Sequence, residues 1–181
     1  MRRSFDQAEH GHHGTGPSGG GGDGSNRSST FLGAGNDLFF SSGFVAANPN
    51  SKIPALVDRS GNTPQRVFES GAILRYLAEK SGQFMPTSPR LAKEIDEWLF
   101  WQVGNLGPMG GQMSHFVNYA EGDHAYAERR YRDEYHRCLG VLERRLESRD
   151  YLVGGQYSAA DIISWPWVLI ARACCRFMRA P

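Results

Sequence analysis

The sequence has little net charge and no long uncharged apolar run, and each absence excludes a class of protein. The formal net charge is +1 at pH 7, so we expect neither a nucleic-acid partner nor an anionic membrane surface. The most apolar stretch, residues 162–175, contains Arg172 and is shorter than a bilayer span. The composition is 40% hydrophobic, which is enough for a globular core and predicts no membrane segment.

Cysteine is also scarce, and its spacing excludes a disulfide framework. The three cysteines are Cys138, Cys174 and Cys175, with no CxxC pair among them. An odd count with an adjacent pair is typical of a reduced intracellular chain. The basic residues after Met1 are not followed by an apolar segment, so no secretory signal is predicted. We therefore expect a cytoplasmic protein.

Residues 1–36 are rich in glycine and serine and almost without apolar side chains. Such a segment cannot offset its ordering entropy by burial, so we predict a disordered tail. His10, His12 and His13 lie in it. Histidines scattered in a disordered tail are the favoured interpretation, and no metal site is predicted.

A globular segment follows at 37–87. "IPALVD" and "RVFES" flank the turn-forming "RSGNTPQ" and predict a β-hairpin. The next residues predict a helix that ends with Gly82 as its C-terminal cap. We expect Ile73, Leu74 and Leu77 on the apolar face of this helix.

The remainder, 88–181, is predicted to be helical. One helix starts near Pro89 and is bent or interrupted by the glycines and Pro108 between residues 104 and 111. A second helix, 125–148, carries an apolar stripe that includes Cys138, so this cysteine is expected to be buried.

Ser158 and Asp161 have capping-box spacing and mark the start of a third helix in this remainder. We expect the Ser158 side chain to accept the backbone N–H of Asp161, while the aspartate reaches back to the N–H of Ser158. The helix is apolar nearly all round, which predicts a central, buried position. Pro166 inside it predicts a kink.

The two ends of the hairpin carry a candidate binding site. Pro54 has no N–H for the ladder, and a cis Ile53–Pro54 bond would turn the Ile53 backbone outward for an extended peptide. Glu69 and Ser70 stand at a helix start, where free N–H groups and the hydroxyl can seat a carboxylate and Glu69 can take an ammonium group. These features predict a small peptide ligand with an amino-acid-like end. An edge proline that blocks aggregation and an ordinary helix cap are the alternatives.

Four segments carry a family resemblance: "NPNSKIPALVD", "RVFESGAILRYLAEKSGQF", "WLFWQVGNLGPMGGQMSHF" and "YLVGGQYSAADIISWPW". Over residues 40–167 the chain resembles a glutathione transferase, most closely the bacterial Nu-class branch, whose members reduce disulfides with glutathione. The resemblance implies an α+β fold, with a partial thioredoxin-like domain at 37–87 and an all-α domain at 88–181. It also implies a homodimer, with glutathione as co-substrate and a small electrophile or disulfide as the second substrate.

The resemblance also implies roles for individual residues. Ile53, before the cis proline Pro54, would pair with the cysteinyl part of glutathione, and Glu69 with Ser70 would hold its γ-glutamyl end. The other implied contacts are Lys52 to the glycine carboxylate, Arg130 from the helical domain, and Gln112, His115 and Phe116 on the second-ligand side. For His115 itself, packing is favoured over chemistry.

The chain departs from the family pattern at both ends. The strand and the hydroxyl or amide residue that activates the glutathione sulfur have no counterpart here, and Thr15, Ser18 and Asn26 cannot be tied to that role. Phe39 stands where the branch usually has a glutamine, and the family's last helices are not found after Trp167. We therefore expect a chain truncated at both ends, with the catalytic residue unassigned. A non-catalytic binding or dimerisation module is the alternative to an enzyme, and a chain without stable fold is a third.

Overall fold

The computed structural model describes residues 43–174, with side chains as far as residue 170. The predicted tail, 1–36, and its histidines lie outside the described residues. So do the unassigned candidates Thr15, Ser18 and Asn26, and so does Phe39. The chain divides into two compact units, residues 1–52 and residues 53–181, and each is described on its own.

The described part of the first unit is a short turn structure. A 3₁₀ helix, η1 (Phe44–Ala46), follows Gly43, which has a φ of 75°. Asn48 is buried, and its side-chain amide donates to the carbonyl of Lys52. Its side-chain oxygen accepts the N–H of Asn50 at 2.9 Å. One side chain thus fixes the backbone that leads to Lys52.

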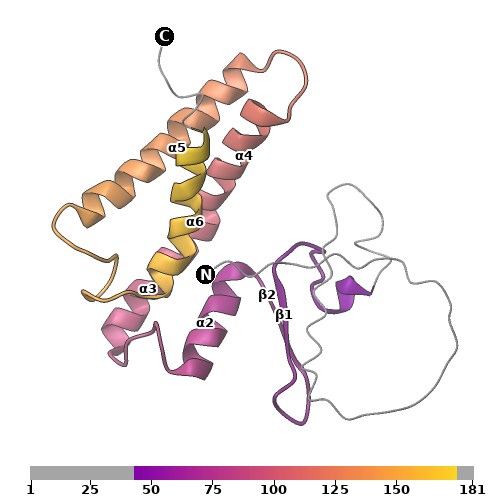
Figure 1. Ribbon diagram of the computed structural model, residues 1–181, viewed down its shortest axis with the longest axis vertical. Helices are drawn as coiled ribbons and strands as arrows, with labels where there is room; N and C mark the ends of the chain where they lie inside the picture. The colour runs from indigo at the N-terminus through magenta and orange to yellow at the C-terminus, as the bar shows by residue number, and fades with distance from the viewer. Residues whose placement is uncertain (1–42, 175–181) are drawn as a thin grey trace, which may run out of the picture. The chain divides into compact units, whose positions relative to one another are not determined.

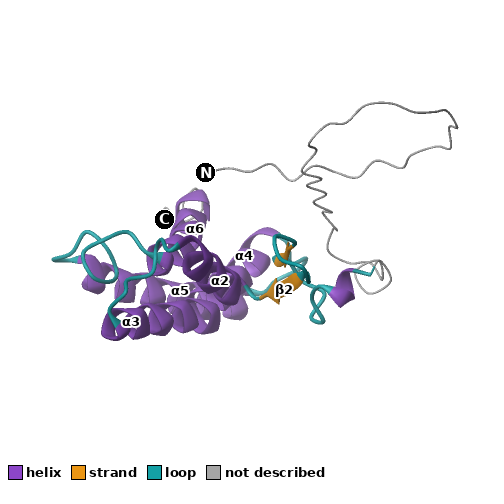
Figure 2. Ribbon diagram, turned by 90° about the horizontal axis from the view of Figure 1, so that it is seen from below, coloured by secondary structure: helices purple, strands orange, loops and turns teal. Residues whose placement is uncertain are grey.

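The second unit begins with the predicted hairpin. Strands β1 (Ala55–Asp58) and β2 (Gln65–Phe68) pair antiparallel, with Ala55 opposite Phe68. Helix α2 (Ser70–Ser81) follows directly and ends at Gly82, whose φ of 65° is the left-handed conformation expected of a glycine cap. The hairpin and the capped helix are therefore both confirmed. The hairpin contacts α2, and α2 also packs against α6 (Figures 1 and 2).

The expected interruption in the next helix is a π-helix. Helix α3 (Pro89–Trp101) runs into η2 (Gln102–Leu106), and α4 (Gly107–Asn118) continues from it. The N–H of Gly107 donates to the carbonyl of Gln102, five residues earlier, and Pro108 has no N–H to donate. The glycines and the proline therefore widen the helix for one turn and do not end it.

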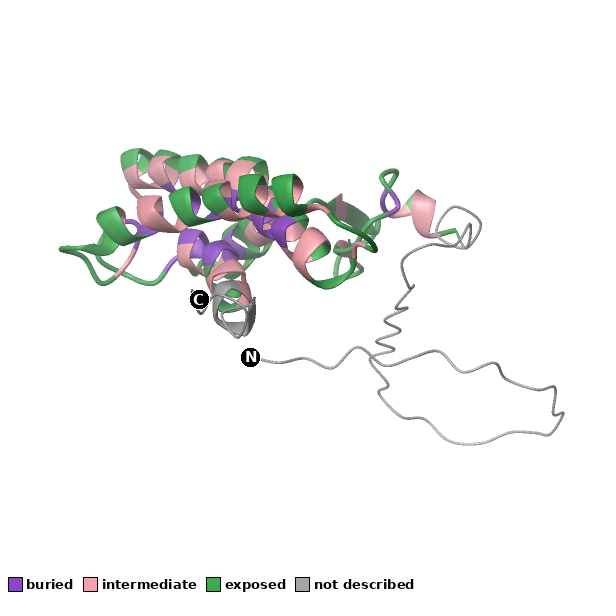
Figure 3. Cartoon of the chain, turned by 90° about the horizontal axis from the view of Figure 1, so that it is seen from above, coloured by how far each residue is buried: buried purple, intermediate pink, exposed green. Residues whose placement is uncertain are grey.

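Helices α5 (Ala125–Leu146) and α6 (Ala159–Cys174) complete the unit, and α5 ends two residues before the predicted position. The core lies where α3, α4, α5 and α6 meet (Figure 3). Cys138 of the predicted stripe is fully buried in it. Tyr135 is fully buried there too, and its hydroxyl donates to the carbonyl of Trp167. Among residues 43–174, no helix combines the length and the apolar character that crossing a membrane requires.

The start of α6 differs in detail from the predicted capping box. The Asp161 carboxylate accepts the N–H of Ser158 at 2.9 Å, as expected, and also the N–H of Leu152 at 2.9 Å. The Ser158 hydroxyl, however, donates to that carboxylate at 2.8 Å. The N–H of Asp161 donates to the carbonyl of Ser158 at 3.1 Å and not to its hydroxyl. The carboxylate therefore collects three donors and ties the preceding loop to the helix.

The expectation that α6 is buried all round is wrong for residues 165–170, the last whose side chains the structure describes. Ala159, Ala160 and Ile163 are buried, whereas Trp165 is 53% exposed and Leu169 is 42% exposed. The reason is that the neighbours of α6 in the described part of the chain, mainly α2, α3, η2 and α4, leave these two side chains uncovered. Pro166 lies inside α6, as predicted.

Two neighbouring glycines of α4 provide a test of this packing. A Cβ on Gly110 would lie 2.9 Å from Cε2 of Tyr135 and 3.1 Å from Cε3 of Trp167, and the bond between these two residues restricts their movement. We expect Gly110→Ala to lower the free energy of unfolding by about 1 to 2 kcal/mol, because overpacking outweighs the gain in helix propensity.

Gly111→Ala is the matched control, because its Cβ would meet no atom closer than 3.9 Å. It should raise the free energy of unfolding by up to about 1 kcal/mol. Urea unfolding of both variants measures the difference, and equal stabilities would contradict the packing described here.

Candidate functional site

The junction between β2 and α2 is conformationally unusual. Glu69 has a φ of 68° and a ψ of 125°, a region that residues other than glycine rarely occupy. Its side chain makes no capping hydrogen bond to α2. Its carbonyl accepts the N–H of Ile73 at 2.9 Å, while the N–H groups of the first turn have no intrahelical partner. Ordinary capping therefore does not explain Glu69, and the helix end is free to bind an anion.

The other predicted half of the site lies directly beside this junction. The Ile53–Pro54 peptide bond is cis, and Ile53 is 52% exposed. Because Ala55 pairs with Phe68, Pro54 and Glu69 are the next residues outward on the two neighbouring strands. Within the described residues, the backbone of Ile53 has no hydrogen bond. The hairpin thus places an unpaired backbone next to the first turn of α2.

A cavity of about 420 Å³ adjoins Glu69, and the sequence did not indicate it. It lies between the start of α2 and α3, and most of its surface is apolar. Its charged wall is an ion pair in which Nη1 of Arg75 lies 2.6 Å from both carboxylate oxygens of Asp96. Phe100 stands at its rim and is 72% exposed. The lining residues are Glu69, Gly71, Ala72, Arg75, Asp96, Leu99, Phe100 and Val103.

A second feature that sequence reasoning missed ties the hairpin to α2. Asp58, the last residue of β1, accepts hydrogen bonds from the Lys80 ammonium and, at 2.5 Å, from the Tyr76 hydroxyl. It also accepts the N–H of Ser60 at 2.8 Å. The bonds from Lys80 and Tyr76 hold the pKa of the Asp58 carboxyl well below its usual range. The available signal was the i,i+4 spacing of Tyr76 and Lys80 on one face of α2.

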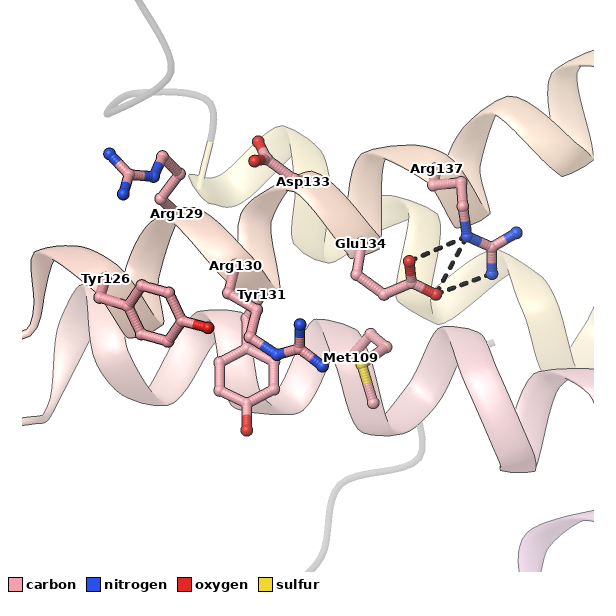
Figure 4. Close-up of a pocket in the computed structure, with 8 residues that line it drawn as sticks. All are labelled: Met109, Tyr126, Arg129, Arg130, Tyr131, Asp133, Glu134 and Arg137. Carbon is pink, nitrogen blue, oxygen red and sulfur yellow. Dashed lines mark hydrogen bonds and ion pairs between the residues drawn. The ribbon is translucent and has the colours of Figure 1, made fainter.

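Arg130 lines a different cavity, of about 660 Å³, on the surface of α4 and α5 (Figure 4). In Figure 4, Arg130 points toward α4, and the carboxylate of Glu134 faces Arg137. The residues that line this cavity include neither Glu69 nor Ser70. The structure therefore does not bring Arg130 into one cavity with the start of α2, and its contact with the peptide ligand stays a prediction.

The remaining candidates occupy three places. Gln112, His115 and Phe116 lie on α4, where Gln112 and His115 are exposed and Phe116 stacks on Tyr131 at 5.5 Å between ring centroids. Lys52 is exposed in the first unit. The thiol of Cys138 is buried in the core, and burial raises its pKa, which makes it a poor nucleophile.

Two family models match the chain. Residues 37–79 match the model described as glutathione S-transferase, N-terminal domain, and residues 123–180 match glutathione S-transferase, C-terminal domain. Among curated proteins, the disulfide-bond oxidoreductase YfcG of Escherichia coli is 51% identical over 128 residues. That match covers 69% of this chain and 60% of YfcG, so the chain spans less than two thirds of that relative.

Solved structures give the same result. A glutathione transferase from Pseudomonas putida, with glutathione disulfide bound, is 40% identical with a TM-score of 0.71, covering 79% of this chain and 66% of that one. A glutathione transferase family member from Pseudomonas fluorescens, with two glutathione bound, is 35% identical with a TM-score of 0.67. It covers 76% of this chain and 71% of that one. The predicted α+β fold, a partial thioredoxin-like part followed by helices, is confirmed by these matches.

The backbone at Glu69 provides a stability test in which two variants separate strain from side-chain chemistry. A φ of 68° strains any residue with a Cβ by about 1 to 3 kcal/mol, whereas glycine adopts it freely at an entropic cost of about 0.5 to 1 kcal/mol. We expect Glu69→Gly to raise the free energy of unfolding by about 1 kcal/mol. Glu69→Ala, which keeps the backbone strain, should not raise the free energy of unfolding.

Thermal and urea unfolding of the two variants measure the effect. A Glu69→Gly chain less stable than Glu69→Ala would show that the junction is not strained.

Proposed function

Because the chain belongs to the glutathione transferase family, we propose that it binds glutathione and uses the glutathione thiolate to reduce small disulfides or to attack electrophiles. The observation that carries this proposal is the hairpin geometry. An unpaired backbone at Ile53 and the open first turn of α2 at Ser70 lie at neighbouring strand ends. A peptide with an α-amino-acid end complements both.

Each end of the ligand has a partner at this site. The γ-glutamyl carboxylate binds the first N–H groups of α2 and the Ser70 hydroxyl, where the helix dipole favours negative charge. Glu69 takes the γ-glutamyl ammonium group. The backbone of Ile53 pairs with the cysteinyl residue of glutathione as an added strand. Lys52 and Arg130 are proposed to bind the remaining carboxylate and the outer face of the tripeptide.

The reaction requires no cysteine of the protein. The glutathione thiolate attacks one sulfur of a small disulfide, forming a mixed disulfide and releasing the other half as a thiolate. A second glutathione thiolate attacks the mixed disulfide, giving glutathione disulfide and the second reduced thiol. Cys138 is buried in the core and takes no part. Gln112, His115 and Phe116 on α4 are proposed to line the side from which the second substrate enters.

We further propose a cytoplasmic homodimer. A reduced, glutathione-rich compartment supplies the co-substrate and agrees with the cysteine usage. The cavity of about 420 Å³ and the exposed ring of Phe100 at its rim are complementary apolar features on one surface. A two-fold interface brings such a surface against its own copy, so that each ring can enter the partner's cavity.

The binding site is tested by Ser70→Ala in the full chain, with Ser81→Ala as a matched control at the other end of α2. A lost hydrogen bond to a charged group costs about 1.5 kcal/mol, so Ser70→Ala should weaken glutathione binding about tenfold. The Ser81 hydroxyl donates to the carbonyl of Ala78 and lies outside the site, so its removal should leave affinity unchanged.

Isothermal titration with glutathione measures both variants. Absence of heat with the unmodified chain, or equal affinities for the two variants, would contradict the proposed site. Turnover of a small disulfide with excess glutathione then separates an enzyme from a non-catalytic binding module, because a module binds glutathione without turnover.

The homodimer is tested by Phe100→Glu. A carboxylate placed in the apolar cavity of a second copy would be desolvated without a partner, so the variant should be monomeric. Glu97→Gln, one turn earlier on α3 and exposed, is the control. Sedimentation velocity distinguishes the two states, and a Phe100→Glu dimer as stable as the unmodified one would refute this interface.

A further inference from the structure

We infer that Asp58 is a positioning residue for glutathione: through Tyr76 and Lys80 it fixes α2 against the hairpin and thereby sets the distance between the Ile53 backbone and the first turn of α2. The inference rests on the proposed function. It concerns a residue that does not touch the ligand, at the opposite end of β1 from Pro54.

The geometry of the cluster supports this role. Asp58 ends β1, and Tyr76 and Lys80 lie on α2, so the hydrogen bonds of this cluster join two elements that are separated in sequence by the β2 strand. The Asp58 carboxylate is largely covered, with 14% of its side chain exposed. Tyr76 and Lys80 donate to its Oδ2, and the N–H of Ser60 donates to its Oδ1. Lys80 also contacts the Ser60 hydroxyl. The carboxylate is therefore held in one orientation.

The cluster lies far enough along α2 from Ser70 to affect the tilt of the helix at the site. Tyr76 is six residues and Lys80 ten residues after Ser70, which at a rise of 1.5 Å per residue is about 9 Å and about 15 Å along α2. The ligand groups proposed for glutathione are divided between the two tied elements, with Ile53 ahead of β1 and Ser70 on α2. A helix held at its junction with β2 and again at Tyr76 has a fixed tilt. Without the second tie, α2 is held to the hairpin by the junction and by apolar contacts, because the Arg75–Asp96 ion pair joins α2 to α3 and not to the hairpin.

The expected effect is on position and not on overall stability. Isolated surface ion pairs contribute little to the free energy of unfolding, and Lys80 is 43% exposed. The groups that bind a ligand, by contrast, must be held within about 0.5 Å of their productive positions, so a change in the tilt of α2 weakens binding. The cluster therefore predicts a loss of glutathione affinity that is out of proportion to any loss of stability.

The test compares Asp58→Asn with Glu94→Gln in the full chain. Glu94 pairs with Arg145 and ties α3 to α5, so its removal breaks an interhelical ion pair of similar exposure far from the hairpin. Titration with glutathione should show an affinity loss of about tenfold for Asp58→Asn and no change for Glu94→Gln. The midpoints of thermal unfolding of the two variants should shift by similar, small amounts. In disulfide turnover, Asp58→Asn should raise the KM for glutathione and leave kcat unchanged.

A milder pair keeps the inference testable if Asp58→Asn does not fold. Lys80→Met removes the charge and should weaken glutathione binding, while Lys80→Arg keeps the ion pair and should restore it. Equal affinity of Lys80→Met and the unmodified chain, or an equal loss for Asp58→Asn and Glu94→Gln, would overturn the positioning role while glutathione binding itself stands. Absence of binding by the unmodified chain would overturn the proposed function, and with it this inference.

Discussion

The chain passes from strand β2 into helix α2 through a single residue, Glu69, and the rest of the candidate site depends on how tightly that turn is made. A left-handed φ at this residue turns the helix axis back across the hairpin within one peptide unit. The Glu69 side chain makes no capping hydrogen bond, so it leaves the first N–H groups of α2 open at this turn. The open helix end therefore arises from the conformation of Glu69, and it lies beside the exposed Ile53 because Ala55 pairs with Phe68.

The helical part supports this junction from the other side. An added Cβ on Gly71 would lie within 3.9 Å of Leu99, Val103 and Ile163, so the first turn of α2 rests closely on α3, η2 and α6. The π-helical turn η2 joins α3 to α4 in one continuous helical stretch, and its Val103 is among the residues that contact this first turn. The glycines of η2 and α4 therefore serve two purposes, since they permit that turn and admit the rings of Tyr135 and Trp167 to the core.

Local patterns were sufficient to predict most of the fold. The proline before β1, the turn residues between the strands, Gly82 and the stripe through Cys138 each act within a few residues, and the hairpin, α2 and α5 follow from them. Sequence patterns failed to predict exposure and hydrogen bonding where these depend on residues that are distant in the sequence. The hydrophobicity of α6 gave no indication that Trp165 stays exposed, because exposure depends on which helices lie alongside. The capping-box pattern likewise did not indicate that the Ser158 hydroxyl donates to the Asp161 carboxylate, which also accepts the N–H of Leu152.

For the site, the sequence indicated Glu69 and Ser70 but not the strained φ, since a glutamate gives no signal of that conformation. For the Asp58 cluster the sequence offered only the i,i+4 spacing of Tyr76 and Lys80, because the carboxylate that they share lies eighteen or more positions away. Arg130 and Glu69 both follow from the family resemblance, yet they line separate cavities. The most direct measurement is a titration of the ¹⁵N-labelled chain with glutathione, followed by amide chemical shifts. We expect the largest changes at Ser70, Gly71 and Ala72. No change at these amides at saturating glutathione would contradict the proposed site.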